Sequence, residues 1–62
     1  MPITPKQIVK KLKENGFEEV SQKGSHLKMK NPKTGRQAIV PMHAKDIPPG
    51  TERAIYKQAG LI

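Results

Sequence analysis

The sequence predicts an α+β fold in which a helix, three strands and a second helix follow one another along the chain. Three observations predict this order: helix-start chemistry at Thr4, alternating polar and apolar residues from His26 to Lys30, and a Pro-Pro-Gly-Thr turn at 48–51 before a second amphipathic segment. A sheet this small buries one of its faces by packing it against helices. We therefore expect a three-stranded antiparallel sheet with both helices on one face, in a single domain over residues 1–62.

The first helix is expected over residues 5–15. Thr4 offers a capping oxygen, and Gln7 three residues later completes a capping box. Pro5 stands at the first helical position, where its missing N–H is no loss. Gly16 fits the position just past the helix end, which commonly needs a positive φ. The basic side of this helix consists of Lys6, Lys10 and Lys13.

Three strands are expected over residues 18–22, 26–30 and 36–42. The first is rich in polar residues, which is typical of an edge strand. In the second, Leu27 and Met29 point to one face, and the residues between them point to the other. The loop at 31–35 contains Pro32 and Gly35, residues that favour a tight hairpin connection.

This hairpin brings two histidines to the same end of the sheet. With a turn centred near Lys33, His26 is expected opposite Val40 in the antiparallel register. His43 then follows about three residues later, roughly 10 Å along the strand. Both histidines are therefore expected far from the connecting loop.

A second helix is expected after the turn at 48–51. Ala54, Ile55 and Ala59 share one side at helical spacing, which indicates the side that packs on the sheet. Gly60 is a second candidate for a helix-ending glycine. The opposite, basic side carries Arg53 and Lys57.

Charge is the strongest feature of the composition. Twelve Lys and Arg residues against five Asp and Glu residues give a formal net charge of +7. This balance favours a polyanionic partner, most often a nucleic acid. The chain has no cysteine, which excludes disulfides and thiolate metal sites. Its longest apolar run, 38–40, is too short for a transmembrane helix or a signal peptide, so no membrane association is expected.

The candidate for proton-transfer chemistry is His26, which shares a strand face with Lys28 and Lys30. An imidazole can accept a proton from the 2′-hydroxyl of RNA, while cations stabilise the charge that develops on the attacked phosphate. His43 and Asp46 could supply two metal ligands, but a site needs three or four. No metal and no cofactor is therefore expected.

Each of these residues also has a purely structural interpretation. A histidine at a strand start is often only a solvated polar residue, and His43 could simply support a turn. Gly24 could let a phosphate approach the backbone closely, or it could merely end a strand. Ser25 does not form a nucleophile–base pair with His26, because neighbours in a strand point to opposite faces. The lysine stripes are commonly solvated helix faces.

The order of several motifs resembles the HicA-type toxins of bacterial and archaeal toxin–antitoxin pairs. The resemblance rests on Gly24-Ser25-His26, on the loop at 31–35, and on the Val-Pro-Met-His run at 40–43. It also includes the closing segment at 50–61 and the Asn-Gly-Phe that follows the first helix. Each motif alone is weak evidence for the family, but the ordered set at this spacing is strong evidence. The resemblance covers essentially the whole chain.

The resemblance implies a double-stranded-RNA-binding-domain-like fold and an endoribonuclease of the mRNA interferase type, cytoplasmic and neutralised by a cognate HicB antitoxin. It assigns catalysis to His26, with Gly24 and Ser25 as supporting motif positions and His43 as a motif position of less clear role. Two residues depart from the family pattern. Leu27 replaces a polar or aromatic residue of some members, and Glu52 replaces an apolar residue of many.

The leading hypothesis is therefore a metal-independent endoribonuclease toxin that cleaves mRNA and inhibits translation and growth. The antitoxin is expected to present acidic groups to the basic surface. The alternative is a non-catalytic RNA-binding module with the same fold, and a third possibility is a basic structural protein of a ribonucleoprotein particle. The residues expected to bind RNA are Lys28, Lys30, Lys6, Lys10, Lys13, Arg53 and Lys57.

Overall fold

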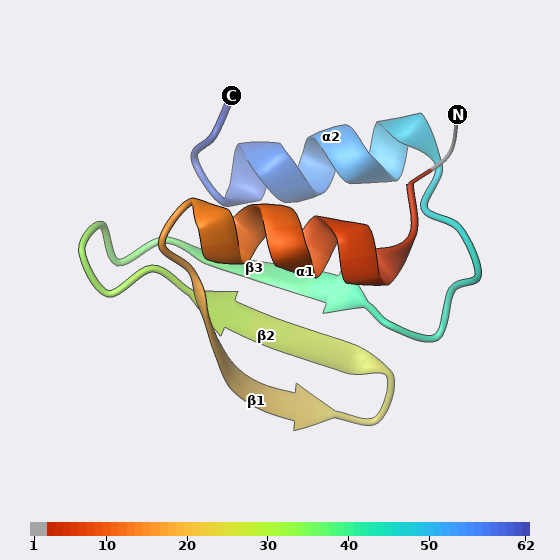
Figure 1. Cartoon of the computed structure of the whole chain (residues 1–62), viewed down its shortest axis with the longest axis horizontal. Helices are drawn as coiled ribbons and strands as arrows, with labels where there is room; N and C mark the ends of the chain where they lie inside the picture. The colour runs from red at the N-terminus through yellow and green to blue at the C-terminus, as the bar shows by residue number, and fades with distance from the viewer. Residues whose placement is uncertain (1–2) are drawn as a thin grey trace.

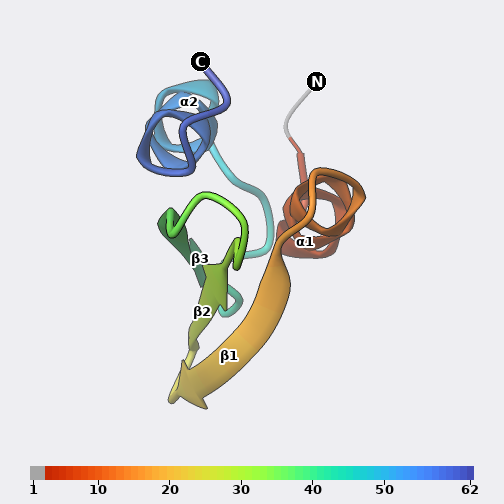
Figure 2. The same cartoon turned by 90° about the vertical axis from the view of Figure 1, so that its left-hand side faces the viewer.

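The computed structural model describes residues 3–62 and has the predicted α-β-β-β-α order. Two helices lie side by side on one face of a three-stranded antiparallel sheet, as Figures 1 and 2 show. Of the eight element ends predicted with residue numbers, four agree with the structure and four differ by one residue. The elements are α1 (Pro5–Glu14), β1 (Glu18–Lys23), β2 (His26–Lys30), β3 (Gln37–Pro41) and α2 (Pro49–Gln58).

The local signals at α1 act as predicted. The Thr4 side chain accepts a hydrogen bond from the backbone N–H of Gln7, and the Gln7 side chain accepts one from the backbone N–H of Thr4. At the other end, Gly16 has φ +91°, and its N–H together with that of Phe17 donates to carbonyls of the last helical turn. These bonds satisfy groups that a helix end otherwise leaves unpaired.

The sheet has the order β1-β2-β3, and in β2 and β3 buried residues alternate with more exposed ones. On the inner face, Leu27 and Met29 of β2 and Ala38 and Val40 of β3 are buried beneath the helices. The outward-pointing residues of the same strands form what we call the open face. The predicted alternation in β2 is thus confirmed. The rest of the core consists of Ile8, Val9, Leu12, Phe17, Ile47, Ile55 and Ala59.

The predicted register between β2 and β3 is wrong by one residue. His26 pairs with Pro41 and not with Val40, which pairs with Leu27. The cause is a longer loop: Arg36 belongs to the connection, and its carbonyl accepts a 2.9 Å hydrogen bond from the N–H of Asn31. Consequently His43 follows the partner of His26 by two residues and not by three.

β1 is an edge strand, as its polar composition predicted, and all six of its residues are exposed. The register shifts between Glu19 and Ser21, so Val20 is an extra, unpaired residue in a β-bulge. Contact with the helix layer includes an ion pair of 2.7 Å between Glu19 and Lys13 of α1. This strand therefore joins the fold mainly through its backbone bonds to β2.

The apolar side of α2 is narrower than predicted. Ile55 and Ala59 are buried, but Ala54 is exposed, so its assignment to the core was wrong. The buried stripe extends instead toward Tyr56, which packs partly against the core. A second link joins α2 to the sheet: the backbone N–H of Ile39 donates to Oε1 of Gln58 over 3.1 Å. α2 thereby covers the outer edge of β3.

Two tertiary contacts were not predicted. Ile3 and Ile47 form an isolated antiparallel bridge, which ties the segment before α1 to the segment before α2. Asn31 is buried and its side-chain amide donates to the carbonyl of Asn15 at the end of α1, while its Oδ1 accepts from the N–H of Lys33. The two contacts thus hold the segments that follow opposite ends of the β2–β3 pair.

Candidate functional site

His26 is placed at the very start of β2 by a two-residue hairpin loop. Gly24 and Ser25 form this loop, and Gly24 has φ +60°, a conformation that glycine adopts without steric cost. The carbonyl of Ser25 accepts a 2.6 Å hydrogen bond from the N–H of Met42, which extends the pairing beyond β3. The backbone at His26 is therefore fixed by pairing with β1 on one side and β3 on the other, while its side chain is exposed.

A hollow of about 590 Å³ lies on the open face around this histidine. We call it the His26 hollow; it is lined by Ser21, Lys23, His26, Lys28 and Ile39. The register explains why these residues meet. Lys23 lies directly opposite His26, while Ser21 and Ile39 lie on either side of Lys28 in the next row of the sheet. Directly opposed residues share a face, so all five point outward.

The charge around the His26 hollow is positive. Lys23 and Lys28 line it together with the imidazole, and no carboxylate belongs to the lining. Lys30 lies one row further along the open face, opposite Glu18 of β1. An exposed imidazole between two ammonium groups can exchange a proton with a bound phosphodiester while cations offset the phosphate charge.

The predicted basic residues fall on two separate surfaces. Lys28 and Lys30 share the open face with His26, whereas five others lie on the helices that cover the inner face. Within the helix group, Lys13 already pairs with Glu19. The sequence indicates the same division, because it places the first group on the outward side of a strand and the second on the basic sides of two helices. The helix group consists of Lys6, Lys10, Lys13, Arg53 and Lys57.

Comparison with known families decides the identity of the chain. The family described as the HicA toxin of bacterial toxin-antitoxin matches residues 5–61. The chain belongs to the HicA toxin family. It is thus a toxin of a toxin–antitoxin system, and a cognate antitoxin is its partner. A search among curated proteins gave no match.

His43, the motif histidine of this HicA-family chain after β3, does not share the His26 hollow. His43 is exposed and lines a different hollow, with Gln22, Gly24, Ser25 and Met42. The two histidines thus lie at the same end of the sheet, as predicted, but their hollows share no lining residue. Leu27 is buried on the inner face, so its departure from the family pattern leaves the open face unchanged.

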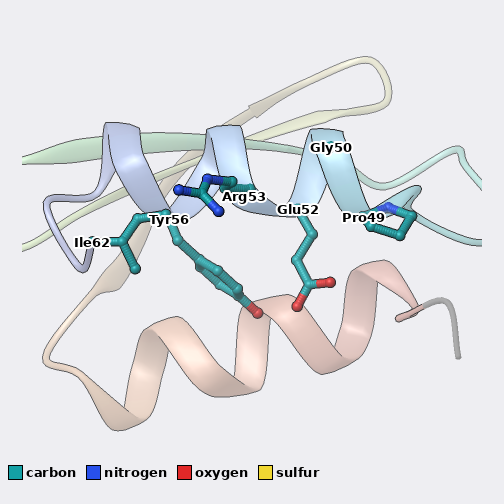
Figure 3. A pocket seen from close by; sticks show the side chains of 6 residues that line it. All are labelled: Pro49, Gly50, Glu52, Arg53, Tyr56 and Ile62. Carbon is teal, nitrogen blue, oxygen red and sulfur yellow. The ribbon is translucent and has the colours of Figure 1, made fainter.

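Glu52, the second departure, lies in the first turn of α2 and lines a hollow formed by α2 and Ile62 (Figure 3). Its carboxylate points toward the Tyr56 hydroxyl, and this hydroxyl is buried without a hydrogen-bond partner. Burial, and then the nearby Glu52 charge, raise the pKa of Tyr56 to about 12. The ammonium of Lys11 lies 5.3 Å from the centre of the Tyr56 ring, so a cation–π contact joins the helices.

Sequence reasoning missed Lys23 and Ile39 as members of the site. The signal for Lys23 was present: a two-residue Gly24-Ser25 loop forces Lys23 and His26 to be partners. The predicted strand, however, ended at residue 22. Ile39 had no comparable signal, because its place beside Lys28 depends on the length of the loop between β2 and β3.

Over residues 3–62, no three His, Cys, Asp or Glu side chains gather in a way that could hold a metal ion. Neither α1 nor α2 has the length and apolar character of a membrane-crossing helix, and no other helix is present in that range.

Proposed function

We propose that this HicA-family chain is an endoribonuclease that cleaves mRNA at the His26 hollow and thereby inhibits translation and growth. The observation that carries the proposal is the position of His26. It is exposed on the open face and lies between Lys23 of the neighbouring strand and Lys28 of its own strand. The reaction takes place in the cytoplasm, where mRNA is translated, within one domain that spans residues 1–62.

The proposed reaction uses a nucleophile that the substrate supplies. The imidazole of His26 accepts the proton of a 2′-hydroxyl, and the 2′ oxygen attacks the adjacent phosphorus. The bond from phosphorus to the 5′ oxygen breaks, which leaves a 2′,3′-cyclic phosphate and a 5′-hydroxyl. The imidazolium or water returns a proton to the departing oxygen. The ammonium of Lys28 stabilises the negative charge that builds on the phosphate.

The remaining basic residues serve RNA binding in this proposal. Lys30 continues the positive open face away from His26. Lysines and the arginine of the helix layer add affinity without sequence preference through the release of counterions. The cognate antitoxin is proposed to be HicB-like and to present acidic groups to these surfaces.

Replacement of His26 by Ala tests the proposal. We expect RNA cleavage to fall by about 10²- to 10⁴-fold, which is the usual contribution of a general acid–base group. The wild-type chain should cleave RNA equally well in EDTA, and H26A should no longer arrest growth when it is expressed. His43→Ala is the matched control, since it removes the other exposed imidazole from a separate hollow.

Two results would contradict this assignment. Undiminished cleavage by H26A would remove His26 from the mechanism. If the wild-type chain binds RNA with a steep salt dependence and leaves every strand intact, the protein is a non-catalytic RNA-binding module.

A further inference from the structure

An apolar side chain lies among the charged residues of the His26 hollow. Ile39 of β3 is 43% exposed, although large apolar side chains of this chain are mostly buried. It pairs directly with Lys28, and it lines the same hollow as His26 and Lys23. Neither charge nor proton transfer explains an apolar group at this position.

We propose that the His26 hollow is a subsite for one unpaired nucleotide of RNA, with its phosphate at Lys23 and Lys28 and its base on Ile39. This inference rests on the proposed function, because the phosphate in question is the one that the 2′ oxygen attacks after His26 accepts the 2′-hydroxyl proton. It adds Lys23 and Ile39 to the RNA-binding residues. It also defines the substrate class as RNA whose bases are free of pairing.

The register supports this division of roles. Lys23 is the cross-strand partner of His26, and Lys28 is two residues along the same strand, so both ammonium groups flank the imidazole. Ile39 is the diagonal neighbour of His26, at a spacing of about 7–8 Å for residues so related. A phosphate held near the imidazole therefore leaves its own base within reach of the Ile39 side chain.

The apolar surface favours unpaired RNA over duplex RNA. A base within an A-form duplex is stacked and paired, so an apolar side chain on an open sheet cannot reach its face. A base in a single-stranded segment can rotate out and lie on an exposed side chain. The two lysines supply the charge complementarity that RNA requires.

The test measures binding without cleavage. The probe is a short, fluorescein-labelled single strand of fully 2′-O-methylated RNA, which lacks the nucleophilic hydroxyl, and its affinity is followed by fluorescence anisotropy. We expect Ile39→Ala to weaken binding about fivefold, which corresponds to the loss of roughly 40 Å² of buried apolar contact with the base. Lys23→Gln should weaken binding and lower the salt dependence of log K by about 0.7, the share of one phosphate contact on a single strand.

Matched controls come from elsewhere in the chain. Ile62→Ala removes the same side chain from the exposed hollow on the helix side, and Lys33→Gln removes a charge from the loop between β2 and β3. Both should keep the affinity within about twofold. The same probe annealed to its complement should bind I39A and wild type equally, because the bases are then inaccessible. Circular dichroism verifies that each variant is folded.

The outcomes separate this inference from the proposed function. If I39A binds the single strand as tightly as wild type, or loses the same affinity for the duplex, the nucleotide subsite is wrong. This holds even where H26A abolishes cleavage. Conversely, if H26A still cleaves RNA, the catalytic assignment fails. The anisotropy data alone then decide whether the hollow binds an unpaired nucleotide.

Discussion

The two faces of β2 show how a five-residue strand serves two separate purposes. Leu27 and Met29 point inward and are buried beneath the helices. His26, Lys28 and Lys30 point outward, where they meet solvent and the neighbouring strands. Each inward residue is apolar and each outward residue is titratable, so stability and proposed chemistry alternate along the same strand.

The buried core and the proposed site therefore use different side chains, although both are built on the same backbone. The inner residues hold the register, and the register then decides which outward residues become neighbours of His26. A substitution on the inner face is therefore expected to change the stability of the fold. A substitution on the open face is expected to change RNA binding or cleavage. Three predictions test that separation.

The largest effect is expected on the inner face. Met29→Ala removes a fully buried side chain and should lower the free energy of unfolding by about 2–5 kcal/mol. For a chain of this length, total stability is only about 3–9 kcal/mol, so a large part of it is lost. Urea titration measures the change. Lys30→Ala on the other face of the same strand is the control, expected within about 0.5 kcal/mol of wild type. Equal losses in both variants would refute the separation.

A smaller effect is expected for Lys28→Gln on the open face. It should reduce kcat/KM for RNA cleavage by roughly 10- to 100-fold, because one cation that stabilises the developing phosphate charge is lost. Lys10→Gln removes the same charge from the exposed side of α1, behind the sheet, and should cost less than about threefold. Single-turnover cleavage with each variant in excess provides the comparison. Equal losses would mean that total charge, and not its position beside His26, decides the rate.

The smallest effect is expected in the helix layer, at the buried hydroxyl of Tyr56. Its pKa is about 12 in the folded chain against 10.0 for the unperturbed group. Below pH 10 the residue is neutral in both states and contributes no pH dependence. Between pH 10 and pH 12 the unfolded chain ionises first, so stability falls as the pH rises. Since Tyr56 is partly exposed, this loss amounts to roughly 1 kcal/mol.

Tyr56→Phe isolates this contribution. The variant should lack that part of the decline between pH 10 and pH 12, while lysine titrations affect both proteins alike. Near neutral pH its stability should be similar to wild type, because the lost hydroxyl has no hydrogen-bond partner. RNA cleavage at neutral pH should be unchanged. An identical pH dependence in the two proteins would show that Tyr56 does not titrate as its surroundings indicate.

Those parts of the fold that depend on neighbours in sequence were predictable. The capping pair of Thr4 and Gln7 lies within one helical turn, and Gly16 ends α1 by its own backbone conformation. Likewise, the alternation in β2 directly distinguishes its buried from its outward residues. In each case the physical cause lies within a few residues, so composition and spacing contain it.

Features that depend on distant contacts were not predictable in the same way. Whether Ala54 or Tyr56 completes the buried side of α2 depends on the rotation of that helix over β3. The register of β2 with β3 depends on a loop closed by Arg36 and anchored by the buried Asn31. The bulge at Val20 has no local signal at all.

The candidate site shows the same limit. Proximity of Lys28 to His26 follows from strand alternation and was predicted, but proximity of Lys23 and Ile39 follows from the register. The division of the basic residues between the open face and the helices, in contrast, follows from strand alternation and from the expected packing of both helices on one face, so the sequence indicated it.

The hydrogen bond between Gln58 and Ile39 has a consequence for the behaviour of this chain at high concentration. An edge strand with free backbone groups can recruit another chain and start aggregation. At the β3 edge, the backbone N–H of Ile39 already donates its hydrogen bond to the Gln58 side chain and cannot pair with another strand. At β1 the bulge and the charged residues Glu18 and Lys23 oppose strand addition. A helix side chain thus opposes strand addition at one edge of the sheet, and a bulge and charged residues oppose it at the other.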